Sequence, residues 1–311
     1  MSGERWHADI QITEELVKNC LQDQFPSLTP IEKIECIGEG WDNKVFLVNK
    51  KIIFRFPRRK IAVELIEREN KVLKNLQSIL SIEIPNPKYI GQPTSHYSYS
   101  FHGYKMIKGT SGCHAQLNDQ DRITSLAPLS IFLKQLHSIN ENQALAMGAK
   151  PQVYDRTEVN KVVETLNERV EKIVTRKLCS INKDYFKDEM RIAQTIELPS
   201  EKCLVHGDLY CRHLMFNKGQ LTGIIDWGDV GINNRSVDLS VIWSFYPNSC
   251  HKKFLETYGP VDPATWQYAR FLGLYSALTM MIYANDIGDP LLVKEAIDAI
   301  KRIRRELLFD E

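Results

Sequence analysis

The residues best suited to chemistry lie in two stretches, HGDLYCRH at 206–213 and IIDWGD at 224–229. Asp208 follows the apolar run CLV, His213 stands five positions later, and Asp226 follows the apolar pair Ile-Ile. Phosphoryl transfer needs one carboxylate to orient or deprotonate the acceptor hydroxyl, and further ligands to hold Mg²⁺ against the nucleotide phosphates. The sequence therefore predicts Asp208 as the catalytic carboxylate, with His213 and Asp226 as metal ligands.

The spacing of these residues resembles that of protein kinases, which carry H-R-D-x-x-x-x-N followed by D-F-G. Asp208 and His213 keep the interval of the first motif, with His213 in place of the asparagine, and DWG at 226–228 stands in place of D-F-G. A neutral imidazole can bind a metal, but Mg²⁺ prefers oxygen ligands. His213 is therefore the main departure from the kinase pattern.

The same stretch is open to a second interpretation. His206, Asp208, His213 and Asp226 could surround a transition metal as a mixed nitrogen and oxygen site, as in a metallohydrolase. No further histidine motif such as H-E-x-x-H supports that class in the sequence. Phosphoryl transfer is the favoured interpretation, and His206 is then expected to be a structural hydrogen-bonding residue.

Composition limits the classes of partner. The chain has 311 residues, of which 43% are hydrophobic and 25% charged, as is usual for a globular protein with a sizeable core. Forty basic and 39 acidic residues leave a net charge of +1, so no electrostatic attraction to nucleic acid or to an anionic membrane is expected. The oligomeric state stays open.

The seven cysteines indicate a reducing compartment. They are odd in number and scattered, and no pair is spaced as C-x-x-C. The segment 1–12 carries charge throughout and lacks the apolar core of a signal peptide. The longest apolar run, 271–284, is too short to span a bilayer and is typical of a buried helix. We expect a cytoplasmic protein.

The first hundred residues predict a small sheet with helices. Residues 12–21 have helical periodicity, and 31–56 read as strands with a hairpin turn at Asn49-Lys50. Residues 62–76 return to helical spacing, and further strands are expected around 89–93 and 99–109.

Beyond Gly109 the pattern is mainly helical, broken by two strand-like runs that carry the stretches described above. The expected helices are 126–139, 158–174, 187–195, 237–245, 268–283 and 290–308. The sequence thus predicts an α+β, two-lobe, protein-kinase-like fold with a small antiparallel-sheet lobe at 1–108 and a larger, mostly helical lobe at 109–311.

The chain resembles the aminoglycoside phosphotransferase and choline kinase-like group of small-molecule kinases in two segments, HGDLYCRHLMF and GIIDWGD. The macrolide kinase-like members of that group are similar to this chain in having His at the position of His213. Five further segments resemble parts of that group in the same order: the nucleotide loop at 37–43, IIFRFP at 52–57, ELIEREN at 64–70, FLKQLH at 132–137 and RSVDL at 235–239. Within the last segment, Asp238 is expected to fix the catalytic loop by hydrogen bonds.

The resemblance implies that the first lobe binds the nucleotide. The residues implied are Gly38, Gly40, Trp41, Asn43, Arg55, Glu69, Lys105 and Ile107. The loop has two glycines of the three in G-x-G-x-x-G, and alone it would indicate only a tight turn. The strand ending at 104–107 resembles the segment between the lobes, whose backbone would pair with the edge of a purine.

Arg55 stands where the group more often has lysine, and a guanidinium can pair two phosphate oxygens in a fixed fork. Its expected partner is Glu69, with Glu64 and Glu67 as alternatives on the same helix.

The implied function is Mg²⁺-dependent transfer of the γ-phosphate of ATP or GTP to a hydroxyl of a small molecule. The charges after Asp226 are mixed in sign, so an aminoglycoside, a macrolide-like molecule or another hydroxylated acceptor all remain candidates. A catalytically weak nucleotide-binding regulatory protein on the same fold is the alternative, because the loop glycine, the lysine and the asparagine of the pattern are all replaced.

Overall fold

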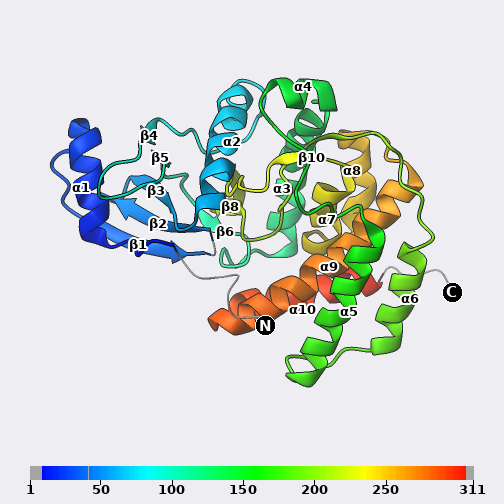
Figure 1. Ribbon diagram of the computed structural model, residues 1–311. Coiled ribbons are helices and arrows are strands. Elements are labelled where there is room, and N and C mark those ends of the chain that lie inside the picture. The colour runs from blue at the N-terminus through cyan, green and yellow to red at the C-terminus, as the bar shows by residue number, and fades with distance from the viewer. Residues whose placement is uncertain (1–8, 41, 306–311) are drawn as a thin grey trace. The chain divides into compact units, whose positions relative to one another are not determined.

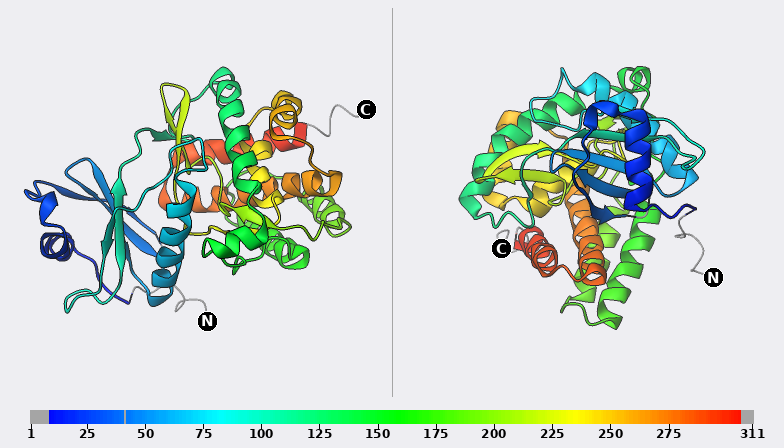
Figure 2. Two further views of the ribbon diagram at one scale, coloured as in Figure 1. Left: turned by 90° about the horizontal axis from the view of Figure 1, so that it is seen from above. Right: turned by 90° about the vertical axis from the view of Figure 1, so that its left-hand side faces the viewer.

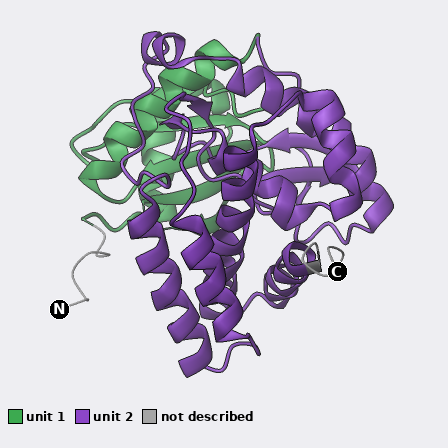
Figure 3. Ribbon diagram, turned by 90° about the vertical axis from the view of Figure 1, so that its right-hand side faces the viewer, with its two compact units in different colours: residues 1–78, 84–107 green, residues 79–83, 108–311 purple. Residues whose placement is uncertain are grey.

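The computed structural model describes residues 9–40 and 42–305. Contacts between Cα atoms divide the chain into two compact units, residues 1–78 with 84–107, and residues 79–83 with 108–311 (Figure 3). The segment 79–83 joins the second unit because Glu83 O accepts a hydrogen bond of 3.0 Å from Ile224 N. An antiparallel sheet in the first unit and mostly helices in the second confirm the predicted α+β architecture.

The first unit is built on a five-stranded antiparallel sheet in the order β1-β2-β3-β5-β4 (Figure 1). Its strands are β1 (Ile34–Glu39), β2 (Asn43–Val48), β3 (Ile52–Pro57), β4 (Tyr89–Gly91) and β5 (Phe101–Lys105). The predicted hairpin joins β2 to β3. Asn49 and Lys50 both have positive φ, at 49° and 55°, and Lys51 N donates to Val48 O at 3.0 Å. Asn tolerates this conformation better than most residues, which explains the turn at this position.

Two helices flank this sheet. Helix α1 (Glu14–Gln24) begins at Thr13, whose hydroxyl accepts a hydrogen bond from Leu16 N at 3.2 Å, and the short 3₁₀ helix η1 (Pro26–Leu28) follows it. Helix α2 (Lys60–Leu76) lies after β3, as the spacing of its apolar residues predicts. The views in Figure 2 show the sheet between the two helices.

Successive side chains of β3 point to opposite faces of the sheet, and the residues on the two faces differ in character. Phe54 and Phe56 are fully buried in an aromatic core that also takes Val17 of α1. Arg55 points to the opposite face, toward α2. One strand therefore supplies both the core of the first unit and a buried cation.

The second unit is mainly helical. Its helices are α3 (Asp119–His137), α4 (Glu141–Ala146), α5 (Val159–Thr175), α6 (Lys183–Ala193), α7 (Ser236–Phe245), α8 (His251–Tyr258), α9 (Pro263–Ile287) and α10 (Pro290–Arg305), with a 3₁₀ turn η2 (Asn248–Cys250). Helix α9 packs against α5, α7 and α10, and every residue of α7 is buried. Within the part of the chain that the structure describes, no helix combines the length and apolarity needed to cross a membrane.

Two small antiparallel sheets carry the chemical stretches. β7 (Cys203–Val205) pairs with β10 (Gly231–Asn233), while β6 (Thr110–Ser111), β8 (Leu214–Asn217) and β9 (Gln220–Ile224) form the other sheet. The pairs Val205↔Gly231 and Leu214↔Ile224 lie where the loops 206–213 and 225–230 begin or end. Strand pairing at both ends therefore holds the two loops side by side.

Helix caps explain most differences from the predicted bounds. Helix α3 begins earlier than predicted because Asn118 and Asp121 form a capping box, with Asp121 N donating to Asn118 Oδ1 at 2.9 Å. Helix α9 begins earlier because Asp262 caps it by accepting from Thr265 N at 2.8 Å. The short helices α4 and α8 lie outside the predicted set.

Candidate active site

Asp208 lies in the loop after β7, and a glycine sets the path of the chain there. Gly207 has φ of 87°, and a Cβ atom on it would collide with Asp229 O and the amide of Gln152. A side chain at this position would therefore be both strained and obstructed. The side chain of Asp208 is 36% exposed.

Asp238 holds this loop from behind. It is fully buried, and its carboxylate accepts from His206 N at 2.7 Å and from Gly207 N at 2.9 Å. His137 Nε2 lies 3.1 Å from the same carboxylate, and its Nδ1 lies 2.8 Å from the hydroxyl of Tyr258. The predicted role of Asp238 in fixing the loop by hydrogen bonds is confirmed.

The pKa of Asp238 reflects these contacts. Burial by itself would raise the pKa of the carboxyl, but the hydrogen bond with His137 and the amide of Gly207 outweigh burial and lower it. Asp238 is therefore a permanently ionised anchor at neutral pH.

His206 is a structural residue in this arrangement. Its Nδ1 accepts from Asp208 N at 3.3 Å and its Nε2 donates to Ile225 O at 3.0 Å, which tie the two loops together. Burial lowers the pKa of His206, against the opposing charge of Asp238, so the ring is neutral. The interpretation of His206 as a hydrogen-bonding residue is confirmed.

His213 lies between the two other chemical residues. Its Nδ1 donates to Asp208 O at 2.7 Å, and its Nε2 lies 3.3 Å from Asp226 Oδ2. Burial would lower the pKa of His213, but the hydrogen bond and charge of Asp226, with the charge of Asp208, raise it. The raised pKa favours the protonated ring, which can pair with the Asp226 carboxylate.

Asp226 follows β9 in an unusual conformation. Its φ of 64° lies in the left-handed region, and its side chain is 49% exposed. Backbone of this kind is concentrated at functional sites. The strand holds the backbone of this residue, and its carboxylate reaches solvent.

His213 Nε2 and Asp226 Oδ2 are spaced as two ligands of one Mg²⁺ ion, whose other positions a bound phosphate or water would fill. In an octahedral site with bonds of about 2.1 Å, neighbouring ligand atoms lie about 3 Å apart, and phosphate oxygens or water commonly fill the remaining positions. The 3.3 Å between His213 Nε2 and Asp226 Oδ2 is close to that value. Because His213 Nδ1 donates its proton to Asp208 O, Nε2 is the ring nitrogen that would bind Mg²⁺ beside Asp226.

A metallohydrolase site finds less support. Catalytic zinc sites use three protein ligands. Among residues 9–40 and 42–305, the structure contains no group of three or more His, Cys, Asp and Glu side chains that could hold a metal ion. His206, which that interpretation needs, uses both ring nitrogens in hydrogen bonds.

Arg156 was not predicted as a site residue. It lies in the loop before α5, and its Nη2 is 3.2 Å from Asp208 Oδ1. The hydroxyl of Tyr268 donates to the carbonyl of Arg156 at 2.7 Å and positions this part of the loop. Arg156 belongs to no motif and is 52 residues from Asp208, so only the fold connects them.

In the first unit, the expected ion pair is present. Arg55 Nη1 lies 2.7 Å from Glu69 Oε1, with the Arg55 side chain 8% exposed and that of Glu69 fully buried. Glu64 and Glu67 are exposed, and Glu67 accepts from Ser100 at 3.3 Å. Whether this pair contacts phosphates remains a prediction.

The predicted nucleotide loop is the turn between β1 and β2. Gly40 N donates to Asn43 O at 2.9 Å, and Arg58 donates to Gly40 O at 2.8 Å. A Cβ atom on Gly38 or Gly40 would meet its neighbours only at 3.6 Å or more, so the fold itself has room for a larger residue. Trp41 lies outside the described residues.

Lys105 and Ile107 lie at the end of the first unit. Lys105 is the last residue of β5 and is exposed, whereas Ile107 is buried. Met106 N, between them, donates to Lys51 O at 2.8 Å. Their part in nucleotide binding also stays a prediction.

Comparison with known proteins identifies the family to which this chain is similar. The model of the phosphotransferase enzyme family matches residues 33–272, most of the chain. Aminoglycoside 3'-phosphotransferases of Escherichia coli and Salmonella typhimurium are each 37% identical over 67 residues, 20% of this chain. That match spans only 24% of the length of either relative.

Solved structures share the fold over nearly the whole chain. The GDP and kanamycin complex of APH(2")-IIia has a TM-score of 0.69 at 23% identity, covering 93% of this chain and 98% of that one. The apoenzyme of a macrolide 2'-phosphotransferase from Brachybacterium faecium has a TM-score of 0.58 at 18% identity, covering 86% and 91%. Both likenesses support the kinase-like fold.

Proposed function

Because the chain belongs to the phosphotransferase enzyme family, we propose that it transfers the γ-phosphate of ATP or GTP to a hydroxyl group of a small molecule. The observation that carries this proposal is the arrangement of the loops 206–213 and 225–230. Asp208 and Asp226 keep partly exposed carboxylates on either side of His213, while Asp238 fixes the first loop from behind.

Asp208 is the catalytic residue of this proposal. Its carboxylate would accept the proton or the hydrogen bond of the acceptor hydroxyl and direct the oxygen toward phosphorus. His213 and Asp226 would hold Mg²⁺, which when bound neutralises charge on the nucleotide phosphates. His206 and Asp238 contribute by keeping the loop rigid, since positioning of this kind is a large part of phosphoryl-transfer catalysis.

The first unit would bind the nucleotide, in the role expected for the lobe at 1–108. Arg55, oriented by Glu69, offers a guanidinium to phosphate oxygens. Gly38, Gly40, Trp41 and Asn43 would cover the phosphates, and the room beside both glycines suits close approach by a ligand. The backbone at Lys105 to Ile107 would meet the purine.

Arg156 bears on the class of acceptor. Its guanidinium already lies against the carboxylate that would receive the hydroxyl, so an ammonium group of the acceptor close to that hydroxyl would be repelled. A neutral or weakly charged acceptor, such as a macrolide-like molecule, fits this arrangement better than a polycation. Solved relatives of the same fold include complexes with kanamycin and streptomycin and a macrolide 2'-phosphotransferase.

All seven cysteines are free thiols, which suits the reducing cytoplasm as the site of action.

The alternative function is nucleotide binding without turnover. The observation that favours it is again Arg156, because the ion pair with Asp208 has to give way before a hydroxyl can be received.

The test is transfer of labelled γ-phosphate from ATP and from GTP to pooled macrolides, aminoglycosides, choline-like amines and sugars, with and without Mg²⁺. The proposal expects a phosphorylated product that depends on Mg²⁺, greatest in a pool of neutral acceptors. Nucleotide binding without any phosphorylated product would favour the regulatory alternative. Absence of nucleotide binding would overturn both.

A further inference from the structure

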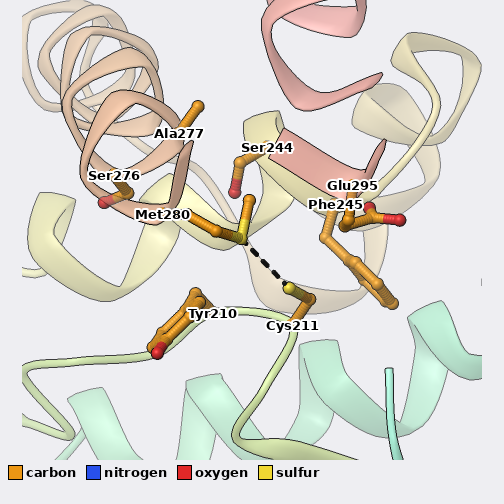
Figure 4. A pocket seen from close by; sticks show the side chains of 8 residues that line it. All are labelled: Tyr210, Cys211, Ser244, Phe245, Ser276, Ala277, Met280 and Glu295. Atoms are coloured by element: carbon orange, nitrogen blue, oxygen red, sulfur yellow. Dashed lines mark hydrogen bonds between the residues drawn. The ribbon is translucent and has the colours of Figure 1, made fainter. Parts of the chain in front are cut away.

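The second unit encloses a cavity that is too small for a substrate. It has a volume of about 10 Å³ and lies beside Cys211, Phe245 and Met280, which Figure 4 shows with the other residues that line it. A cavity of that size has room for about one water molecule. The buried polar side chains around Arg55 in the first unit bear more directly on the proposed reaction.

His102 lies next to Arg55 in the sheet of the first unit. Strands β3 and β5 are antiparallel, and their register places His102 directly opposite Arg55. Side chains of directly opposite residues extend from the same face of a sheet, with Cβ atoms about 4.5–5.5 Å apart. The Arg55 side chain faces α2, so His102 faces α2 as well. Arg55 is 7% exposed and His102 is fully buried, so the imidazole forms part of the immediate surroundings of the guanidinium.

Helix α2 contacts both side chains through two consecutive residues. Glu69 Oε1 lies 2.7 Å from Arg55 Nη1, and Asn70 Oδ1 lies 2.5 Å from His102 Nδ1. One turn of the helix is therefore joined to two neighbouring strands by two side-chain interactions. Because Glu69 and Asn70 belong to the same stretch of backbone, a change at His102 is expected to alter the position of Glu69 relative to Arg55.

The contact with Asn70 determines which ring nitrogen of His102 carries the proton. A side-chain carbonyl oxygen accepts hydrogen bonds, so His102 Nδ1 donates to Asn70 Oδ1 and Nε2 keeps a lone pair. Nε2 is buried and has no hydrogen-bond partner within residues 9–40 and 42–305. Burial, together with the charge of Arg55, lowers the pKa of His102 well below its ordinary value, so the ring is neutral at neutral pH. An unpaired buried acceptor is unfavourable by itself, and a neighbouring cation stabilises it.

From these contacts we infer that His102 is a positioning residue for Arg55 and keeps its guanidinium in the orientation that binds the nucleotide phosphates. His102 contacts no ligand in this role. Its ring, fixed by Asn70, occupies the space beside Arg55 and keeps the guanidinium on Glu69. The N–H donors of arginine form a planar fork, so its orientation decides whether it can pair two phosphate oxygens. The inference rests on the proposed role of Arg55 in nucleotide binding.

The expected effect of losing His102 is confined to phosphate recognition. Adenosine and guanosine lack the groups that Arg55 would bind, whereas ADP and GDP have them. The ratio of diphosphate affinity to nucleoside affinity therefore measures the contribution of Arg55, while a general loss of structure would weaken both ligands together. Without His102 we expect this ratio to fall by about three- to tenfold, the range of one hydrogen bond.

The experiment is isothermal titration of the full chain with ADP, adenosine, GDP and guanosine. His102→Leu replaces the imidazole by an apolar side chain and should lower the ratio. Asn70→Ala removes the hydrogen-bond partner of the ring at a helical position that alanine favours, so it tests the same link if His102→Leu does not fold. Tyr97→Phe is the matched control: it removes another buried hydrogen bond of the first unit, 2.6 Å to Pro57 O, and should leave the ratio unchanged.

A combined variant tests whether His102 acts through Arg55. Arg55→Lys alone should lower the ratio, and adding His102→Leu to it should produce little further loss, because residues that act together are not additive. Losses that multiply would show that His102 acts independently of Arg55 and would overturn the inference.

The outcomes separate this inference from the function on which it rests. A wild-type preference for the diphosphates that survives in both His102→Leu and Asn70→Ala would overturn the inference alone. A loss shared equally by diphosphate and nucleoside would leave that preference intact and would overturn it in the same way. A wild-type protein that binds the diphosphates no better than the nucleosides would contradict the proposed role of Arg55, and the positioning role with it.

Discussion

Asp208 and Asp238 are both carboxylates of the second unit, and the protein surrounds them in opposite ways. Asp238 is fully buried and receives two backbone amides and His137. Asp208 is 36% exposed and has Arg156 on one oxygen at 3.2 Å. A carboxylate whose acceptor positions are filled by the protein has none for a substrate, whereas Asp208 can exchange one partner for another.

The difference indicates how the site divides positioning from chemistry. Asp238 and His206 act on the backbone of the loop and never need to contact a ligand. Asp208 and Asp226 extend from that fixed backbone toward solvent. Substitutions behind the loop should therefore affect stability, and substitutions in front of it should affect turnover.

The largest expected effect on stability follows from Asp238→Asn. The change removes the charge that two backbone amides and His137 contact. Removing one partner of a buried ion pair lowers the free energy of unfolding by about 3–5 kcal/mol. Thermal or urea unfolding should show the loss. A variant as stable as wild type would contradict the anchoring role.

The contribution of Asp238 to the free energy of unfolding also depends on pH. The pKa of Asp238 is lowered in the folded protein from an ordinary 3.8, so its contribution is present above pH 3.8 and is lost as pH falls through the folded pKa. Wild type should lose this stability in acid, and Asp238→Asn should show a flatter pH dependence there.

Asp226→Asn tests the front of the site. Removing one ligand of the Mg²⁺ that would neutralise charge on the phosphates should lower turnover by about 100- to 1,000-fold with little change in unfolding temperature. It should also raise the Mg²⁺ concentration needed for half-maximal rate, measured by titration at saturating nucleotide. Asp184→Asn, on the exposed first turn of α6, is the matched control and should leave both values unchanged.

Arg55→Lys extends the comparison to the first unit. A lysine keeps the charge but loses the planar fork, so we expect about a tenfold weaker nucleotide affinity, consistent with one charged hydrogen bond. Isothermal titration with ADP and GDP measures it. Lys51→Arg, at the exposed turn before β3, is the control. Equal affinity in Arg55→Lys and wild type would remove this residue from the phosphate site.

Arg156→Gln should have the smallest and most selective effect. Without the guanidinium beside Asp208, amine-bearing acceptors should improve in kcat/KM relative to neutral ones by several-fold, up to about tenfold for one screened charge. Competition between a macrolide and an aminoglycoside in one reaction measures the ratio. An unchanged ratio would mean that Arg156 does not select the acceptor.

Much of this arrangement was predictable because it is local in the sequence. The interval from Asp208 to His213, the strand before each loop, and the helical spacing that puts Glu69 opposite Arg55 all arise within short segments. Glu64 and Glu67 stay exposed because they lie on the outer side of α2.

What could not be predicted depends on tertiary contacts. Arg156 reaches Asp208 through a loop whose carbonyl at Arg156 accepts a hydrogen bond from Tyr268 of α9. The short helix α4 needs its Asn140 capping box to be recognised, and its apolar pattern alone is too brief to show a period.

The most direct test is to measure phosphate transfer and unfolding temperature together for Asp208→Asn and Asp238→Asn. Asp208→Asn should lose about 100- to 10,000-fold in turnover, the usual contribution of a general base, and keep the wild-type unfolding temperature. Asp238→Asn should unfold several degrees lower. Full transfer by Asp208→Asn, or a loss of stability equal to that of Asp238→Asn, would contradict the assignment of Asp208 as the catalytic carboxylate.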